Sequence, residues 1–317
     1  MSRFPPKKMG WAGRSQTAQL IGLAAGAAAW MERAADGRQV WQYSTWRADS
    51  HAAGTAAAID AAIDAVVARV QTASPKRPVT WVVSPSLAPS WLQQPSAQIA
   101  SLSELQAVAQ VRAAQLFGTP SSWPQATDAG WNVAGDWHAI RPFLCVALPV
   151  AWRELLQPER TGVAGERRRN IAHPLPLALS RLNKQLPRDG WLALAIAGEV
   201  HLMQRQRGHM TRLRSVRLPA DTPSCTPIEL LVQDEWQREL LRSQHHDEVL
   251  HWLDLTSKPH AISFGNRWQR ITGKPSVHLP DIPPSASGSE VAASSSALHD
   301  ALQVAWSAEH LRAGELT

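Results

Sequence analysis

The sequence predicts an α/β protein made of two halves that repeat one arrangement. The first half opens with the apolar run Gln19–Trp30, which enters a turn that contains glycine, and a helix follows over residues 55–71. The second half opens with the apolar strand Trp191–Ala197, turns at Gly198, and continues through two more strands to a helix over residues 229–242. The shared order of apolar strand, glycine turn, outgoing strand and helix predicts two similar subdomains.

The run Gln19–Trp30 has the outline of a phosphate-binding turn without its polar residues. Gly22 and Gly26 lie four residues apart. Glycine reaches positive φ and carries no side chain, so backbone N–H groups can approach a phosphate there. No Asp, Ser, Thr or Lys lies between Ile21 and Trp30. The sequence therefore predicts a nucleotide site that has lost its side-chain chemistry.

Periodicity and end signals predict the other elements. Ser103 is the expected N-cap of a helix whose apolar side carries Leu105, Val108, Val111 and Leu116, and Gly118 closes it. The remaining strands are expected over residues 38–43 (after a turn at Asp36-Gly37), 79–83, 143–148, 200–205 and 210–218. The remaining helices are expected over residues 151–156, 175–186 and, near the C-terminus, 297–311.

Changes in composition divide the chain into four segments. They are a loose basic arm over residues 1–17, an N-terminal α/β subdomain over 18–150, a C-terminal α/β subdomain over 151–280, and a tail rich in Pro, Ser and Ala over 281–317. The tail ends in the short helix, which can dock on the fold or stay loose.

Composition also favours a folded cytoplasmic protein. Apolar residues make up 44% of the 317 residues, and no run is long enough to span a membrane. The 15 Trp residues are scattered along the chain, which is typical of core packing and separate anchors. Cys145 lies in an apolar run, eighty residues from Cys225, so we expect a buried, reduced thiol.

Positive charge is concentrated between Arg153 and Arg217, where thirteen Lys or Arg face five Asp or Glu. Such a region favours an acidic partner, an anionic membrane surface or nucleic acid, and a solvated face is the alternative. The candidates for binding an anion or a partner are Arg167, Arg168, Arg169, Arg181 and Lys184.

Two halves that each open with a glycine-containing hairpin resemble the duplicated actin-like, or ribonuclease H-like, fold. Within that fold the chain is similar to the platform proteins of type IV pilus and type II secretion machines, of the PilM and GspL type. Gly22, Gly26 and Asp36-Gly37 keep the frame of their first hairpin. The polar positions of the family are occupied here by alanines, namely Ala24, Ala27 and Ala28 in the first half and Ala195 and Ala197 in the second.

The resemblance implies a non-catalytic assembly scaffold that docks the cytoplasmic segment of an inner-membrane protein. It places the chain in the cytoplasm or at the inner face of that membrane. Gly22, Gly26 and Gly198 would be vestigial phosphate turns, so we expect no cofactor and doubt that ATP binds. A third possibility is an active nucleotide site in which the backbone amides of residues 22–27 suffice.

A basic nucleic-acid-associated protein is the alternative from another class. In that interpretation the arginine and lysine candidates neutralise phosphates and Trp191 stacks on a base. Its affinity for nucleic acid would fall steeply with salt, whereas a largely apolar peptide-docking platform would lose little.

The sequence gives weak support for a metal site or for catalytic residues. His245–His251 is the densest group of possible metal ligands, and Glu248 and His251 would share a face if the segment were helical. One pair does not complete a site, so we expect no metal. Cys145 in an apolar strand should be unreactive, and a lone His138 beside Trp137 is more typical of packing than of a general base. We expect no catalytic residues.

Overall fold

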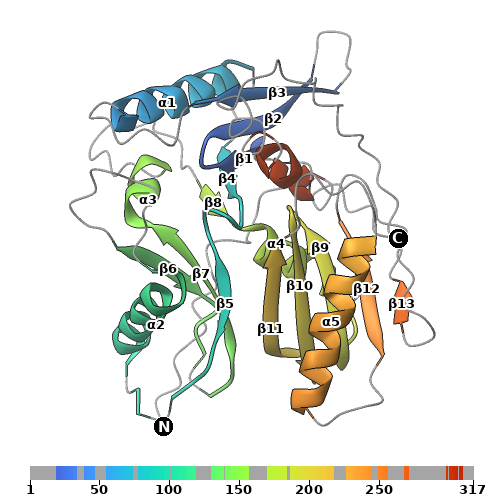
Figure 1. The fold of residues 1–317 in the computed structure, drawn as a ribbon. Helices are drawn as coiled ribbons and strands as arrows, with labels where there is room; N and C mark the ends of the chain where they lie inside the picture. Colours follow the sequence, from blue (N-terminus) through green and yellow to red (C-terminus); the bar gives the residue numbers. More distant parts are fainter. Residues whose placement is uncertain are drawn as a thin grey trace.

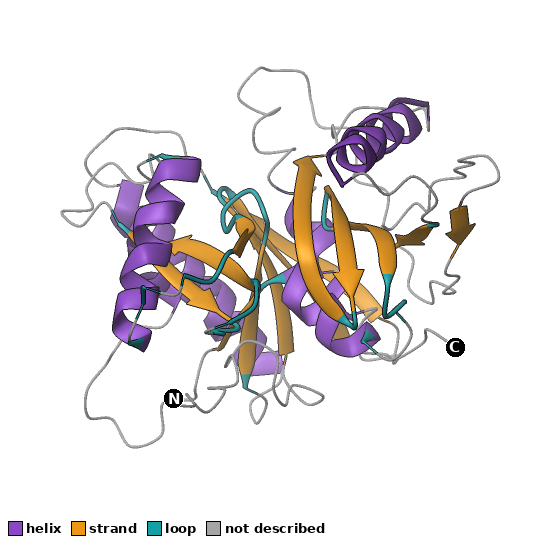
Figure 2. Ribbon diagram, turned by 90° about the horizontal axis from the view of Figure 1, so that it is seen from below, coloured by secondary structure: helices purple, strands orange, loops and turns teal. Residues whose placement is uncertain are grey.

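A computed structural model describes residues 19–33, 39–46, 55–73, 78–96, 98–99, 101–118, 130–138, 140–156, 170–183, 186–217, 226–243, 249–255, 268–270, 298, 300–305 and 307–309. These residues form two lobes and a smaller sheet; in Figure 1 the first lobe lies at the top, with the smaller sheet below it on the left and the second lobe below it on the right. Seen from below, the strands occupy the middle of the molecule and helices lie on either side (Figure 2). Within these ranges, no helix has both the length and the apolar character needed to cross a membrane.

The first lobe is built on a five-stranded sheet in the order β3-β2-β1-β4-β8. β1, β2 and β3 are antiparallel neighbours, whereas β4 runs parallel to β1 and β8 parallel to β4. The strands are β1 (Gln19–Ala24), β2 (Ala27–Arg33), β3 (Gln39–Thr45), β4 (Val79–Val83) and β8 (Asn170–Ala172). β8 thus extends this sheet to Ala172, beyond the boundary expected at residue 150.

β2 corrects the sequence prediction, which placed no separate strand between the first glycine turn and Asp36-Gly37. Ala27–Arg33 pairs with β1 across a two-residue turn and with β3 on its other side. Alanine is a poor strand former, so the local sequence gave little signal. Burial between two neighbouring strands decides the conformation. Asp36-Gly37 itself lies outside the described residues.

β1 is buried on both faces, which explains its continuous apolar sequence. Ile21 and Leu23 pack under α1 (Thr55–Ala73). That helix places apolar side chains at positions 59, 63, 66, 67 and 70, the spacing of one helical face. Leu20 and Ala24 point to the opposite side, toward the second lobe and the C-terminus.

The second lobe repeats the strand order of the first, as β11-β10-β9-β12-β13. Its elements are β9 (Gly190–Ile196), β10 (Glu199–Gln206), β11 (His209–Arg217), α5 (Thr226–Ser243), β12 (Leu250–Asp254) and β13 (Trp268–Arg270). Side chains of β9 alternate between two cores. Trp191 packs toward Trp236 of α5, whereas Leu192 and Leu194 face the core shared with the first lobe.

Two helices cross between the lobes. After β8, α4 (Pro174–Leu182) packs in the core that contains Leu192 and Leu194 of the second lobe. The second is the C-terminal helix, described at residues 298, 300–305 and 307–309 and drawn in red in Figure 1. It returns to the first lobe and packs against β1 and β2. The helix expected near residues 297–311 is therefore docked.

The smaller sheet has the order β5-β7-β6 and is covered by α2. Its elements are β5 (Ser90–Gln93), α2 (Leu102–Phe117), β6 (Trp131–Gly135) and β7 (Phe143–Pro149), followed by α3 (Val150–Leu156). Cys145 of β7 is buried, as expected, and burial raises the pKa of its thiol.

The start and the buried face of α2 differ from the prediction. Ser101, not Ser103, is the N-cap, and its Oγ accepts a hydrogen bond from the Glu104 N–H at 3.2 Å. The helix buries Leu105 together with the small residues Ala109 and Ala113. Three side chains expected on the buried side are exposed instead, namely Val108, Val111 and Leu116. Alanines face the sheet because they let the helix approach it closely.

Tryptophans fill the cores of both lobes. The buried ones are Trp30, Trp81, Trp91, Trp152, Trp191, Trp236 and Trp252. Their distribution over separate cores agrees with the interpretation of scattered structural residues, because no single cluster collects them.

Candidate functional site

The two lobes carry equivalent hairpin turns. In the first lobe the turn at Ala25-Gly26 joins β1 to β2, and in the second the turn at Ala197-Gly198 joins β9 to β10. Ala197 and Gly198 both have positive φ, of 51° and 78°. This conformation suits a two-residue hairpin turn and favours glycine. Gly26 and Gly198, two of the expected phosphate-turn residues, thus lie in turns at corresponding places of the two sheets, although positive φ is recorded only for the second turn.

Gly22, the third glycine predicted to form a phosphate turn, does not lie in either turn. It lies within β1, opposite Ala29 of β2, and not in the turn. A Cβ at Gly22 would lie 2.6 Å from the backbone nitrogen of Ala305 in the C-terminal helix. This glycine permits a close approach of chain to chain, and its expected part in a phosphate turn stays untested.

The C-terminal helix packs beside the first turn. Ala24 and Ala27, which flank the turn, share an apolar cluster with Leu298, Ala301 and Leu302. The alanines that stand where polar residues were expected thus contact another segment of the same chain.

Asp300 links this helix to the second turn. Its Oδ2 accepts a hydrogen bond from Arg217 Nη2 at 2.9 Å and a longer one from Ser86 Oγ at 3.4 Å. A Cβ built at Gly198 would lie 3.8 Å from Asp300 Oδ1. A carboxylate therefore stands beside the second turn and the loop that follows β4. The carboxylate is paired with the Arg217 guanidinium, so its charge is compensated within the cluster.

Two buried histidines lie at the lobe junction. His173 caps the N-terminus of α4, and its Nδ1 accepts the Leu175 N–H at 3.2 Å. His201 of β10 lies 2.8 Å from Ser215 Oγ through its Nδ1. Burial lowers the pKa of each imidazole to about 3, and His201 adds to this effect on His173. Both rings are therefore neutral near pH 7.

Glu199 lies beside His201 at the same junction between the lobes. Its Oε2 lies 3.8 Å from Nε2 of His201. Burial raises the pKa of Glu199 to about 7; Arg217 opposes the shift and Asp300 adds to it. We refer to Ser86, His173, Glu199, His201, Arg217 and Asp300 as the interlobe cluster. Its separate residues carried no recognisable spacing in the sequence, so sequence reasoning missed it.

Of the five basic residues predicted to bind an anion or a partner, the described part of the structure includes only Arg181. Arg181 lies half-buried on α4, whereas Arg167, Arg168, Arg169 and Lys184 lie outside the described residues. Trp191, expected to stack on a base in the nucleic-acid interpretation, is buried in the core of the second lobe. That part of the interpretation is wrong, because a fully buried indole cannot reach a base.

The predicted metal-ligand segment also changes. His251 lies on strand β12, not on a helix, and Glu248 lies outside the described residues. Among the residues described, no group of three or more His, Cys, Asp or Glu side chains is arranged to hold a metal ion.

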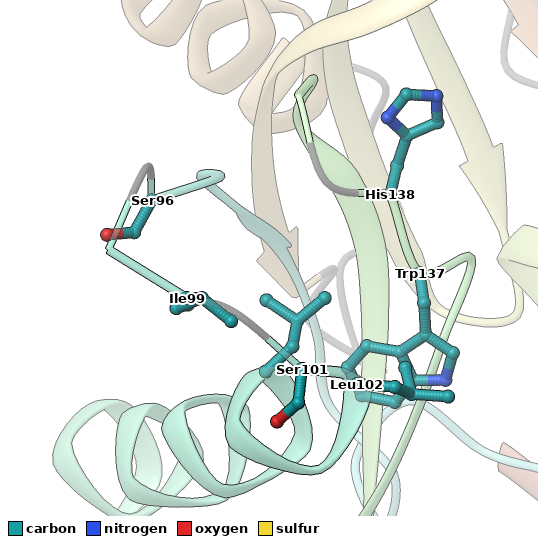
Figure 3. A pocket seen from close by; sticks show the side chains of 7 residues that line it. Ser96, Ile99, Ser101, Leu102, Trp137 and His138 are labelled. Atoms are coloured by element: carbon teal, nitrogen blue, oxygen red, sulfur yellow. The ribbon is translucent and has the colours of Figure 1, made fainter. Parts of the chain in front are cut away.

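A pocket at the start of α2 is a further feature that the sequence did not reveal. Its volume is about 30 Å³, and it is lined by Ser96, Ile99, Ser101, Leu102, Leu105, Trp137 and His138. We call it the α2 pocket. Figure 3 shows Ile99, Leu102 and Trp137 around the start of the helix, whereas the side chain of His138 extends away from them. The lining comes from the segment before α2, the first turn of α2 and the segment after β6.

The topology and the paired turns define the class of fold. Both five-stranded sheets order their strands as third, second, first, fourth and fifth, and a helix from each lobe crosses to the other. This is the duplicated actin-like, ribonuclease H-like α/β fold that the sequence predicted.

Comparison with known proteins finds similar solved structures at low sequence identity. No protein-family model matches the chain, and no curated protein sequence does either. The chain is similar to the cytoplasmic domain of EpsL, an inner-membrane component of the type II secretion system of Vibrio cholerae. Identity is 13% over 79% of this chain and 87% of that one, with a TM-score of 0.41.

Two other solved structures are similar. The PilM-PilN type IV pilus biogenesis complex matches at 12% identity over 95% of this chain and 98% of that one, with a TM-score of 0.48. A protein of Bacteroides thetaiotaomicron with an actin-like ATPase fold and unknown function matches at 8% identity over 78% and 84%, with a TM-score of 0.42.

Proposed function

We propose that this chain is a non-catalytic scaffold of an envelope-associated assembly of the pilus or secretion type. It acts in the cytoplasm or at the inner face of the membrane and docks a segment of a partner protein. The observation that carries the proposal is the C-terminal helix, which packs against Gly22, Ala24 and Ala27 beside the first hairpin turn. In this interpretation the chain's own helix holds the lobes together and a nucleotide is not required.

The residues around the turns support a degenerate nucleotide site. Asp300, which is paired with Arg217, stands beside Gly198, and no lysine lies between Gly26 and Pro75 in the sequence. Losing a lysine contact to phosphate and an aspartate contact to Mg²⁺ would each remove roughly 1.5–3 kcal/mol of charge-assisted binding. We therefore expect millimolar affinity for ATP or none.

A calorimetric and thermal-shift titration with Mg-ATP tests the degenerate site. We expect no saturable heat and no rise in melting temperature below millimolar ATP. Micromolar binding would contradict the proposal and favour an active actin-like site. A single-stranded oligonucleotide, titrated at two salt concentrations, serves as the parallel test, since salt-sensitive binding would favour the nucleic-acid alternative.

Partner docking needs its own experiment. The tagged full-length chain is cross-linked in its native cells, and captured proteins are identified by mass spectrometry. We expect enrichment of an inner-membrane protein that has a short cytoplasmic segment. A synthetic peptide of that segment should then bind the purified chain. Failure of both steps would contradict the scaffold role.

A further inference from the structure

The α2 pocket is lined largely by apolar side chains. Ile99, Leu105 and Trp137 contribute apolar surface, and Trp137 is held in place against Phe143 with ring centres 5.6 Å apart. The two serine hydroxyls are engaged by their own loop, since Ser96 Oγ accepts the Gln98 N–H and Ser101 Oγ accepts the Glu104 N–H. The pocket therefore favours an apolar occupant.

Its size limits that occupant. A water molecule needs roughly 10–15 Å³ measured in the same way, and the pocket has about 30 Å³. The end of one branched aliphatic side chain fits such a space. A nucleobase or an indole ring is too large for it.

Arg141 forms a positive rim beside the pocket. Its Nε donates to Nε2 of His138 at 2.8 Å, and its Nη1 lies 2.9 Å from Nδ1 of His209 in the second lobe. The pKa of both histidines is lowered, first by burial and then by Arg141, so the imidazoles are neutral partners. Across the described residues, no carboxylate lies within ion-pairing distance of Arg141. Its charge is thus fixed in place but not neutralised.

The second-lobe side of the rim is rigid. Arg205, which is buried, donates to the carbonyl oxygens of Pro187 and Gly208 at 2.8 and 3.0 Å. The Arg207 N–H donates to Asp189 Oδ1 at 2.6 Å. These contacts brace the β10–β11 turn that presents His209. The rim is therefore preorganised, which lowers the cost of ordering it on binding.

The net charge around the pocket is positive. In this region the charges of Arg141 and Asp136 both act on His138, the charge of Asp189 acts on Arg205, and Arg207 carries a further positive charge on the β10–β11 turn. Asp189 is already engaged by the β10–β11 turn, so it does not neutralise Arg141. The site thus joins an apolar pocket to a guanidinium that makes no ion pair among the described residues, with Asp136 as the carboxylate whose charge also acts on His138.

We propose that the α2 pocket and Arg141 together dock a partner segment that presents an aliphatic side chain next to a carboxylate. The aliphatic end enters between Leu105 and Trp137, and the carboxylate pairs with the guanidinium. This inference rests on the proposed scaffold function and gives its partner segment a chemistry and a place.

The test uses the full-length chain and a labelled peptide probe of sequence acetyl-Gly-Ser-Leu-Asp-Leu-Glu-Ser-Gly-amide. Fluorescence polarisation measures affinity, and the Trp137 indole NMR signal, assigned through Trp137→Phe, reports the place of binding. We expect saturable binding in the submillimolar range with a shift of that signal. Replacing both leucines of the probe by serine, or both acids by lysine, should abolish binding.

Variants of the chain separate the rim from the fold. Arg141→Glu should weaken probe binding at least tenfold, and Arg141→Gln should lie between it and the wild type. Arg112→Glu, the same charge change on the exposed side of α2, is the matched control and should bind as the wild type does. Unchanged melting temperatures establish that each variant is folded.

Several outcomes would overturn the inference. The first is no saturable binding of the acidic probe at probe concentrations up to about 5 mM, which corresponds to a binding free energy weaker than roughly 4 kcal/mol. The second is that the lysine probe binds as tightly as the acidic probe. The third is that Arg141→Glu binds the acidic probe as tightly as the wild type does. If Arg141→Glu loses the peptide probe yet keeps the partner captured from cells, docking of that partner lies elsewhere and the inference fails while the scaffold role stands. Micromolar ATP binding would instead contradict the scaffold role and leave the peptide result to be judged by itself.

Discussion

Gly22 of β1 and Ala305 of the C-terminal helix are in direct contact, although they lie more than 280 residues apart. A Cβ at Gly22 would come within 2.6 Å of the Ala305 nitrogen and closer still to the carbonyl oxygen of Ala301. Real Cβ contacts are never this short, so the backbone of the helix would have to move. The absence of a side chain at Gly22 is therefore a condition for docking the C-terminal helix.

Gly22→Ala should detach that helix. We expect a loss of at least about 1–3 kcal/mol of unfolding free energy from overpacking, measured by urea denaturation. Cleavage of the tail by a protease should become faster. The control is Gly208→Ala, where φ is +79° and no atom lies within 4 Å. It should cost about 1–2 kcal/mol for the left-handed backbone and leave the tail protected. An unaltered tail in Gly22→Ala would refute the docking role.

Glu199 makes stability fall as pH rises toward neutrality. Its pKa is about 7 in the folded chain against 4.5 without the fold. Between these values the folded state holds a proton that the unfolded state has lost, so the contribution of Glu199 to stability declines as pH rises from 4.5 to 7 and is then constant. Glu199→Gln should stabilise the chain at pH 8 by on the order of 3 kcal/mol and change little at pH 4. Asp60→Asn, on an exposed part of α1, is the control. Equal effects of Glu199→Gln at both pH values would contradict the assignment.

His173 and His201 act in the opposite direction. Their pKa is about 3 when folded against 6.5 otherwise, so the unfolded state binds more protons over that range. Their contribution is complete above pH 6.5 and is lost as pH falls toward 3. Combined with Glu199, the three groups predict that stability rises from about pH 3 to 6.5 and changes little above that pH. Urea denaturation from pH 4 to 8 measures the curve, and a fall in stability between pH 4 and 6 would contradict it.

Trp30 and Trp81 offer a matched comparison in one core. Trp30 Nε1 donates to Glu32 Oε1 at 2.6 Å, and Arg69 lies 5.6 Å from the centre of its ring. Trp81 Nε1 is buried without a hydrogen-bond partner among the described residues. Trp30→Phe should therefore cost about 1.5–3 kcal/mol more than Trp81→Phe, because a hydrogen bond to a charged group is lost. Urea denaturation measures both, and equal costs would count against this account.

Cys145 should be inert in the folded chain. The thiol is buried and its pKa is raised by burial, so little thiolate forms. In a Cys225→Ser background, labelling by a disulfide reagent should proceed only as fast as the chain opens, and urea should accelerate it. Rapid labelling of the native chain would show that this part of β7 is accessible.

Local sequence predicted the elements whose own residues carry a clear periodicity or turn signal. The hairpins of the second lobe, the helix at residues 55–73 and strand β4 follow from periodicity and turn residues, and they were predicted within a few residues. β2 was missed because its alanines have low strand propensity and gain their place by pairing on both sides. The exposed face of α2 was mispredicted because small residues, not large ones, pack against the sheet.

Sequence reasoning found only part of the candidate sites. The sequence predicted a glycine turn after an apolar strand in each half, and the structure has hairpin turns at Gly26 and at Gly198, whereas a phosphate-binding role for these glycines stays a prediction. The interlobe cluster was not predicted, because Ser86, His173 and Asp300 come from distant segments with no motif in common. The rim residues Arg141 and His209 likewise come from different lobes.

The sequence by itself determined an α/β chain of two repeated halves and the loss of polar residues at the first turn. These properties depend on the order of apolar and turn residues, which can be read locally. Only the tertiary structure decided that Gly22 serves a helix contact, that Asp300 stands beside Gly198, and that Arg141 spans two lobes. Each of these depends on which distant segments are buried together, and burial depends on the whole packed chain.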